Sequence, residues 1–244
     1  MVKAVVLLSG GMDSATVLGI AHAGGYDVLA LSFNYGQRHG RELDAGARVA
    51  SYYGVDRFVM SLNFGGMLNS ALVGAGNEEK TIPNYTGSPT HKGEIPPTYV
   101  PSRNIVFLSI ACAIAESIGA SIVFAGMNAL DYSGYPDCRP EFVAAFNEML
   151  KKGSKAGIAG KLEVRAPIIG LSKAQIVKLA RSLGVPLQLT WSCYRGGGKA
   201  CGTCDSCALR LKGFKEAGVT DPIEYEHLSS PAADALKTFV KVRE

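Results

Sequence analysis

Hydrophobic residues in this chain gather in short runs of strand length, and longer stretches with helical spacing separate them. The runs cover residues 4–8, 28–33, 57–61, 122–125 and, most weakly, 162–166. Strands that alternate with helices pair in parallel, because each helix carries the chain back across one face of the sheet. The pattern predicts the α/β class: a doubly wound, Rossmann-like parallel sheet with helices on both faces.

Three helices are recognisable between these runs. The first follows the first strand at 15–21, and the second covers about 102–117. This apolar helix is not a membrane span, since Glu116 and the glycine at 119 interrupt the segment before it is long enough to cross a bilayer. The third helix opens with a capping box at Ser172 and Gln175, runs from 176 to 183, and is expected to be the last helix of the domain.

Composition adds limits on function. The chain has 244 residues, of which 47% are hydrophobic and 19% charged, and a net charge of +4. A mild positive excess favours anionic small molecules, but it lacks the dense basic face of a dedicated nucleic-acid binder. The short apolar start runs straight into a Gly-rich loop, so it does not resemble a signal peptide. We expect a cytoplasmic protein that does not associate with membranes.

The Gly-rich loop SGGMDS at 9–14 follows the first strand and opens a helix. Such a turn directs unpaired N–H groups and the positive end of a helix dipole at one point, which suits an oligophosphate. Gly10 and Gly11 permit the tight turn, Ser9 and Ser14 can donate hydrogen bonds, and Asp13 can hold a metal ion. The loop lacks the Lys-Ser/Thr ending of a Walker motif. The loop resembles the SGGxDS loop of the ATP-pyrophosphatases, which implies ATP bound by its phosphates, with the adenine near the end of the second strand.

Four cysteines form a second motif. Cys193, Cys201, Cys204 and Cys207 have the spacing C-x7-C-x2-C-x2-C among several glycines. Two-residue gaps let thiolates converge on one ion, and four thiolates leave no open position, so the motif predicts a structural Zn²⁺ site. An iron–sulfur cluster is the alternative, because a four-cysteine site accepts either metal. Cys112 lies in the apolar helix and is interpreted as a packing residue.

These features suggest a division of the chain into three parts. Residues 1–185 form the ATP-pyrophosphatase domain, residues 186–228 the zinc-binding region, and residues 229–244 a tail of unknown role with a short amphipathic helix at 231–242. Residues 62–101 are rich in Gly, Asn, Pro and Thr and have little periodicity. A loop of this length is usually either a functional lid or disordered, and we favour a lid over the active site.

Further strings carry a family resemblance. They are YGQRH at 35–39 with Glu42 and Leu43, VPSRN at 100–104, NALDYSGYPDCRPEF at 128–142 and PIIGLSK at 167–173. With the phosphate loop and the cysteines, residues 3–226 closely resemble the 7-cyano-7-deazaguanine synthase family of the PP-loop ATP-pyrophosphatases. The resemblance implies an adenine nucleotide alpha hydrolase-like fold. It also implies a ligase that converts 7-carboxy-7-deazaguanine, ammonium and ATP into the nitrile 7-cyano-7-deazaguanine, a precursor for queuosine and archaeosine.

In that reaction ATP adenylates the acid, ammonia displaces AMP to give an amide, and a second ATP activates the amide oxygen for loss. Catalysis is then mainly positioning and charge neutralisation by Mg²⁺ and cations. The implied catalytic residues are Asp13, Arg38, His39, Arg103 and Lys173. The expected ATP-binding residues are Leu8, Ser9, Gly10, Gly11, Met12, Asp13, Ser14, Ala15, Thr16, Val17, Leu18, Ser32 and Phe33. The expected substrate-binding residues are Asn128, Asp131, Tyr132, Ser133, Tyr135, Asp137 and Arg139, and Cys138 is expected to line the same pocket rather than act as a nucleophile.

The chain contains no recognisable glutaminase segment, so free ammonium is the expected nitrogen donor. The family also suggests a homodimer that binds no nucleic acid directly. Two other functions are weighed. A tRNA-thiolating enzyme would share the phosphate loop but should need persulfide cysteines and an RNA-binding domain. A zinc-knuckle protein would need basic and aromatic residues between its cysteines, where only Tyr194, Arg195 and Lys199 qualify.

Overall fold

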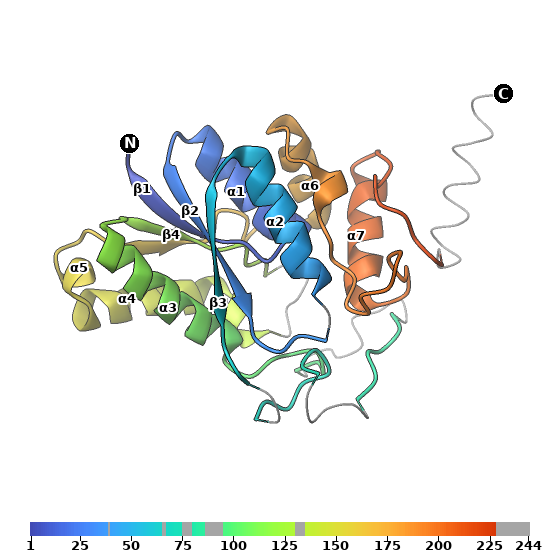
Figure 1. The fold of residues 1–244 in the computed structure, drawn as a ribbon, viewed down its shortest axis with the longest axis horizontal. Coiled ribbons are helices and arrows are strands. Elements are labelled where there is room, and N and C mark those ends of the chain that lie inside the picture. Colours follow the sequence, from blue (N-terminus) through green and yellow to red (C-terminus); the bar gives the residue numbers. More distant parts are fainter. Residues whose placement is uncertain (39, 65–66, 75–79, 86–94, 130–134, 228–244) are drawn as a thin grey trace.

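The computed structural model describes residues 1–38, 40–64, 67–74, 80–85, 95–129 and 135–227 (Figure 1). The predicted tail and its amphipathic helix therefore lie outside the described residues. In chain order the elements are β1 (Lys3–Leu7), α1 (Met12–Ala23), β2 (Asp27–Asn34), α2 (Arg41–Tyr53), β3 (Asp56–Ser61), α3 (Arg103–Ile118), β4 (Ile122–Phe124), the 3-10 turn η1 (Pro136–Cys138), α4 (Pro140–Gly153), α5 (Lys155–Ile158), β5 (Glu163–Arg165), α6 (Lys173–Ser182), the 3-10 turn η2 (Leu187–Leu189) and α7 (Asp205–Glu216).

The five strands form one parallel sheet in the order β3-β2-β1-β4-β5. Each lies within a residue or two of its predicted run, so the predicted fold class is confirmed. The chain moves outward from β1 to β3 and then returns to the other side of β1 to form β4. The carboxyl ends of β1 and β4 therefore flank the point where the strand order reverses, which is where open α/β sheets bind ligands.

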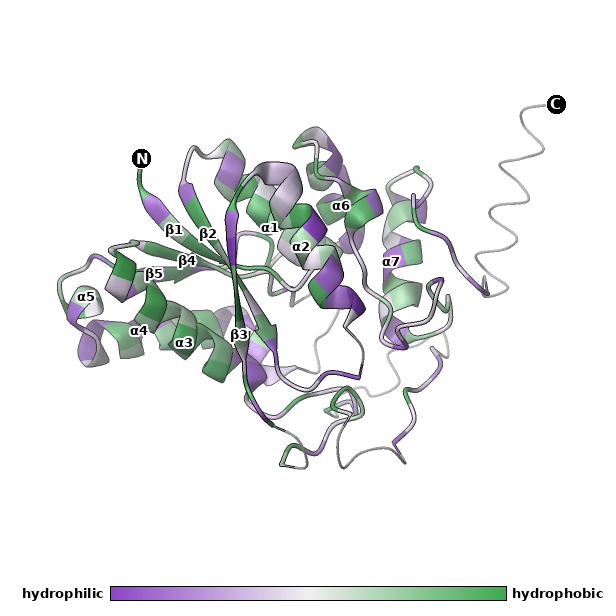
Figure 2. Ribbon diagram, in the orientation of Figure 1, coloured by the Kyte–Doolittle hydropathy of each residue, from purple (hydrophilic) through white to green (hydrophobic). Residues whose placement is uncertain are grey.

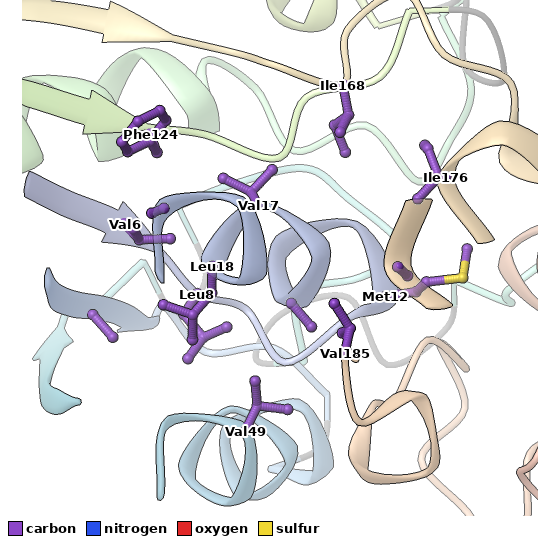
Figure 3. Close-up of a cluster of buried hydrophobic side chains, with 14 of the residues drawn as sticks. Val6, Leu8, Met12, Val17, Leu18, Val49, Phe124, Ile168, Ile176 and Val185 are labelled. Carbon is purple, nitrogen blue, oxygen red and sulfur yellow. The ribbon is translucent and has the colours of Figure 1, made fainter. Parts of the chain in front are cut away.

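Alternate side chains of the central strands enter two separate cores. Ala4, Val6 and Leu8 face α1, α2 and α6, whereas Val5 faces the opposite side with α3 and α4. Figure 3 shows the first core, in which Val6 and Phe124 from the strands meet Val17 and Leu18 of α1. In Figure 2 the central strands are mainly hydrophobic, whereas polar and hydrophobic residues alternate along α2 and α7. This distribution is that of a doubly wound sheet buried on both faces.

Helix boundaries follow local signals. The capping box is present: Gln175 N donates to Ser172 Oγ (3.3 Å) and Ser172 N donates to Gln175 Oε1 (2.8 Å). Both α1 and α6 begin earlier than the predicted 15 and 176. The third predicted helix corresponds to α6, and the next helix, α7, lies in the predicted zinc-binding region, where it packs against α6 and places Phe214 in the first core.

The described part of the 62–101 insertion contains no helix or strand. It is tied to the rest of the molecule by isolated bridges from Val73 to Gln37 and from Asn84 to Cys204, and Leu72 is buried in the second core. Its role as a lid and the domain boundary after residue 185 stay predictions.

Candidate functional site

A cavity of about 270 Å³ opens at the carboxyl ends of β1, β2 and β4. Its walls come from the loop after β1, the residues after β2 and β4, the beginnings of α3 and α6, residues 191–194 and the first turns of α7. The sequence predicted that the loop after β1 and the residues at the end of β2 would lie together. Both line the cavity, so this prediction is confirmed.

The loop after β1 forms the floor of the cavity. Gly10 has a φ of 94°, and a Cβ there would lie 2.2 Å from the Glu42 carbonyl oxygen and 2.5 Å from Gly46 N, so only glycine fits. Ser9 and Ser14 are joined through their hydroxyls (3.0 Å), and Ser14 Oγ also donates to the Gly11 carbonyl (3.1 Å). The two hydroxyls are thus held at the amino end of α1, where an anion is favoured.

Backbone amides at this helix end are left accessible by a second glycine. A Cβ at Gly126, just after β4, would lie 3.0 Å from Ser14 N and 3.1 Å from Ser14 Cα. No side chain caps α1 at Gly11. A phosphate group can therefore approach the first-turn N–H groups of α1 from the cavity.

Asp13 and Lys173 form an ion pair in the cavity wall, with 2.6 Å between Oδ2 and Nζ. The Lys173 side chain is 12% exposed and that of Asp13 is 26% exposed. The other oxygen, Asp13 Oδ1, is buried and has no hydrogen-bond partner within the described ranges. A buried carboxylate oxygen without a partner beside a phosphate loop fits a hard divalent cation such as Mg²⁺.

The position of Lys173 is fixed from two sides. Asn128 Nδ2 donates to the carbonyls of Ile168 (3.2 Å) and Leu171 (2.5 Å), which holds the segment leading into α6 against the end of β4. From the other side α7 packs against the start of α6 at Gly213, where a Cβ would lie 2.6 Å from Lys173 Cβ. Asn128 also lines the cavity.

The opposite wall is aromatic. Phe33 and Phe107 are stacked with centroids 4.0 Å apart and planes at 6°, and Tyr35 meets Phe107 edge-on. Tyr135 lines the same space, and its hydroxyl is 2.7 Å from Thr98 Oγ1. Flat apolar surfaces with hydroxyl groups at their edges suit planar heterocycles.

Arg103 and Glu42 bring opposite charges to this wall. Arg103 is the first residue of α3 and lies over the Tyr35 ring, 6.0 Å from its centroid. Ser102 before it has a φ of 54°, which is unusual outside glycine and directs the helix start toward the cavity. Burial raises the pKa of Glu42 to about 7, although the Arg103 charge opposes the shift; the Cys193 thiol adds to it.

Cys138 and Asp137 have different surroundings. Burial raises the pKa of the Cys138 thiol to about 11, so it is protonated near neutral pH, as expected of a lining residue. Asp137 is buried but does not line the cavity. Its Oδ2 accepts from Asn104 N (3.1 Å) in the first turn of α3. Asp137 therefore stabilises the start of the helix that carries Arg103.

Several residues assigned from the sequence lie apart from the cavity. Arg38 donates to the Lys80 carbonyl (2.6 Å) in a separate hollow that shares Tyr194 with the main cavity. Arg139 is exposed and does not line the cavity. Ser32 is buried, donates to the Leu8 carbonyl (2.6 Å) and accepts from Arg57 Nε (2.8 Å). The buried residues Ala15, Thr16, Val17 and Leu18 of α1 do not line the cavity either. His39, Asp131, Tyr132 and Ser133 are outside the described residues.

The predicted residues that do line the cavity are Leu8, Ser9, Gly11, Met12, Asp13, Ser14, Phe33, Arg103, Asn128, Tyr135 and Lys173. Sequence reasoning missed the contribution of residues 191–194 and α7. Trp191 N donates to the Gly10 carbonyl (2.9 Å), and the Trp191 ring lies under the Arg41 guanidinium (4.6 Å). It is the only tryptophan of the chain, and this was the one signal in the sequence that could have drawn attention to the segment.

The four predicted cysteines form a buried cluster, with their sulfur atoms all within 4.8 Å of one another. Backbone amides of Arg195 and Cys201 donate to Cys193 Sγ (3.4 and 3.3 Å), and that of Cys204 donates to Cys201 Sγ (3.3 Å). Amide donors stabilise thiolates, and four convergent thiolates suit a closed tetrahedral metal site such as structural Zn²⁺.

A buried ion pair supports the same region. Arg210 Nε and Nη2 lie 2.7 and 2.9 Å from the two oxygens of Asp221, and these side chains are 1% and 3% exposed. The guanidinium also donates to Thr190 Oγ1 (2.7 Å) and to the Leu187 carbonyl (3.2 Å). Arg210 thereby fastens α7 to the segment that enters the cavity wall.

Within the described ranges, none of the helices combines the length and the apolar character needed to cross a bilayer.

Comparisons with known proteins show the family to which the chain belongs. The family model described as queuosine biosynthesis protein QueC matches residues 3–218. The chain is 54% identical over 228 residues to 7-cyano-7-deazaguanine synthase 2 of Desulfitobacterium hafniense (strain Y51), covering 92% of this chain and 94% of that protein. It is 52% identical over 224 residues to the 7-cyano-7-deazaguanine synthase of Thermoplasma acidophilum, covering 92% of each. Among solved structures, an NMN synthetase from Francisella tularensis aligns with a TM-score of 0.46 and 15% identity over 98% of this chain and 84% of that one.

Proposed function

The chain belongs to the queuosine biosynthesis protein QueC family, and we propose that it synthesises 7-cyano-7-deazaguanine from 7-carboxy-7-deazaguanine, ammonium and ATP. The observation that supports this most directly is the extent of the match. Residues 3–218 include every described residue that lines the cavity, so the relationship extends to the whole site and not only to the phosphate loop.

ATP would bind with its phosphates on residues 9–14. The first-turn amides of α1 and the hydroxyls of Ser9 and Ser14 lie at that position, and Lys173 adds a positive charge. Asp13 would hold Mg²⁺ through its unpartnered Oδ1. The ion, when bound, would neutralise charge on the phosphates.

The acid would lie toward the aromatic wall. Phe33 and Phe107 offer a face for a planar ring, and Arg103 offers a cation for the carboxylate that becomes adenylated. Adenylation needs no protein nucleophile, in agreement with a protonated Cys138 thiol. These residues would act by placing the carboxylate near the α-phosphate and by excluding water.

The remaining assignments are proposals of the same kind. The enzyme would be an ATP-dependent ligase that forms a carbon–nitrogen bond, the cysteine cluster would hold a structural Zn²⁺ and the protein would act as a homodimer. His39 and the residues at 131–133 retain their proposed roles beside ATP and the acid, whereas Arg38 would have to act from the neighbouring hollow that shares Tyr194 with the cavity.

Product analysis tests the proposal. The pure protein is incubated with Mg-ATP, ammonium and 7-carboxy-7-deazaguanine, each is omitted in turn, and products are identified by mass spectrometry. We expect the nitrile, AMP and pyrophosphate only when all three are present. Asp13→Asn should abolish AMP formation, whereas Asp44→Asn should not. Asp44 is a matched control, because it is an exposed aspartate in the first turn of α2. AMP without nitrile would point to another acceptor, and no ATP cleavage would refute the proposal.

A further inference from the structure

The charges around the cavity are almost all paired. Among the described lining residues, the cations are Arg103, Lys173 and Arg210, and the carboxylates are Asp13 and Glu42. Lys173 pairs with Asp13, and Arg210 pairs with the buried Asp221. Arg103 and Glu42 are left, and no ion pair joins either of them to another described residue.

The backbone of Glu42 is packed closely against the phosphate loop. It lies in the first turn of α2, and its carbonyl oxygen is so close to Gly10 that no Cβ fits between them. Its side chain lines the cavity from the phosphate-loop side, while Arg103 approaches from α3. The Arg103 charge acts on the Glu42 carboxylate, although no hydrogen bond links the two side chains in the described part of the chain. Both residues line the same cavity, so a small polar ligand bound there can contact either of them.

Burial makes an unpaired carboxylate costly. Removing a carboxylate from water is unfavourable unless a cation or donors compensate it. At a surface position such as Asp44, solvent provides this compensation. Glu42 is only half-buried, but its side chain faces the cavity and the Arg103 charge compensates it only from a distance, so a small cation inside the cavity would find a carboxylate available there.

The proposed reaction requires such a cation. Ammonium is positively charged and has no free electron pair, so it must be bound beside the acyl adenylate and lose a proton before it attacks. Of the two lining carboxylates, Asp13 is paired with Lys173 and is the proposed Mg²⁺ ligand, which leaves Glu42 as the carboxylate that can compensate the charge of ammonium. We infer that Glu42 is the ammonium-binding carboxylate of this site and the base that accepts its proton. This inference rests on the proposed function, because it names the site of the nitrogen donor.

The proposed amidation step conserves both protons and electron pairs. Ammonium transfers one proton to Glu42 and becomes ammonia, whose electron pair forms a C–N bond with the carbonyl carbon of the acyl adenylate. The bond from that carbon to the AMP oxygen breaks, and its electron pair leaves with AMP. The new nitrogen loses its extra proton to the phosphate of the departing AMP, and Glu42 returns its proton to water. A carboxylate removed from water accepts a proton more readily than one on the surface.

The test separates adenylation from amidation. Pyrophosphate release is measured with ATP and the acid in the absence of ammonium, and amide and nitrile formation is then measured over a range of ammonium concentrations. For Glu42→Gln we expect pyrophosphate release within about twofold of the wild type and an apparent KM for ammonium raised at least tenfold. Asp44→Asn should change neither quantity, although it removes the same charge from the same helix turn. Glu42→Asp, which keeps the charge and shortens the side chain, should give an intermediate KM.

Hydroxylamine as the nucleophile shows whether Glu42 binds and deprotonates ammonium or only has a structural role. It is a much weaker base than ammonia and is uncharged near neutral pH, so it needs neither a counter-ion nor a proton acceptor to enter. Glu42→Gln should form the hydroxamate from hydroxylamine at close to the wild-type rate. An unchanged KM for ammonium, equal losses with both nucleophiles, or loss of pyrophosphate release would each overturn the inference. Absence of acid-dependent pyrophosphate release in the wild type would instead refute the proposed function, and the inference with it.

Discussion

Replacing Asp221 by Asn should destabilise the protein far more than any surface charge change, because it leaves the Arg210 guanidinium buried without a counter-ion. Both side chains are almost completely inaccessible, and two short hydrogen bonds join them (2.7 and 2.9 Å). Asparagine has nearly the same shape as aspartate, so the substitution removes the negative charge and creates little empty space. Tyr225, whose hydroxyl donates to Asp221 Oδ2 (2.6 Å), keeps an acceptor if the amide oxygen takes that position.

The expected loss follows from the burial. Removing one partner of a buried ion pair costs about 3–5 kcal/mol. In a protein of this size 1 kcal/mol corresponds to about 2–4 °C in Tm, so the shift should be roughly 6–20 °C. Total stabilities of globular proteins are only about 5–15 kcal/mol, so the variant should fold but with a small margin.

Thermal unfolding of the zinc-loaded protein, followed by circular dichroism, measures the effect. Glu148→Gln is the control, since it breaks the exposed pair with Lys151, whose side chains are both 61% exposed, and should leave Tm almost unchanged. A double variant in which Met replaces Arg210 and Leu replaces Asp221 should recover most of the loss, because it removes both charges. A loss below about 1 kcal/mol in Asp221→Asn would refute the argument that this pair is desolvated.

Three further predictions concern the cysteine loop and the phosphate site. Gly202→Ala should lower metal content and Tm, because a Cβ there would lie 1.4 Å from the His227 carbonyl oxygen. Gly218→Ala is the control: this glycine has a similar positive φ but open space around it, so the substitution should cost only about 1–2 kcal/mol. Removal of the metal with a chelator should lower Tm, and added Zn²⁺ should restore it; an unchanged Tm would mean that the four cysteines hold no structural ion. Lys173→Met should slow pyrophosphate formation by about 10²–10³-fold, as expected for loss of a charged group at developing negative charge, and a rate within threefold of wild type would exclude that role.

The sheet could be predicted because its central strands are buried on both faces. Runs such as residues 4–8 and 28–33 are almost continuously apolar, as expected of such strands. The segments between the runs have helical spacing, and strands that are joined by helices pair in parallel. The capping box at Ser172 and Gln175 and the glycines at 10 and 11 are also local signals, since the geometry that they require lies within a few residues. Features of this kind were confirmed.

Features that depend on distant contacts could not be predicted. Arg210 resembles any helical arginine, and its burial depends on Asp221 and on the segment at 187–192, which no periodicity connects with it. The helix α7 begins directly after Cys204, and its charged composition gave no clear apolar stripe. Ser32 was assigned to ATP because it lies near the end of the second apolar run, and the sequence could not show that its hydroxyl bonds the Leu8 carbonyl and Arg57.

These distant contacts give the metal region a direct connection to the nucleotide site. Cys193 lies within the segment 191–194 that forms part of the cavity wall, and Cys204 immediately precedes α7, which contributes Ser206, Leu209 and Arg210 to the same wall. The cysteine cluster therefore anchors the segment 191–194 and the start of α7. Arg210, paired with Asp221, also joins α7 to Leu187 and Thr190, just before that segment. Because Trp191 also binds the Gly10 carbonyl, a displacement of this wall would act directly on the phosphate loop. A structural metal at the cysteines would in this way affect ATP binding without contacting the nucleotide.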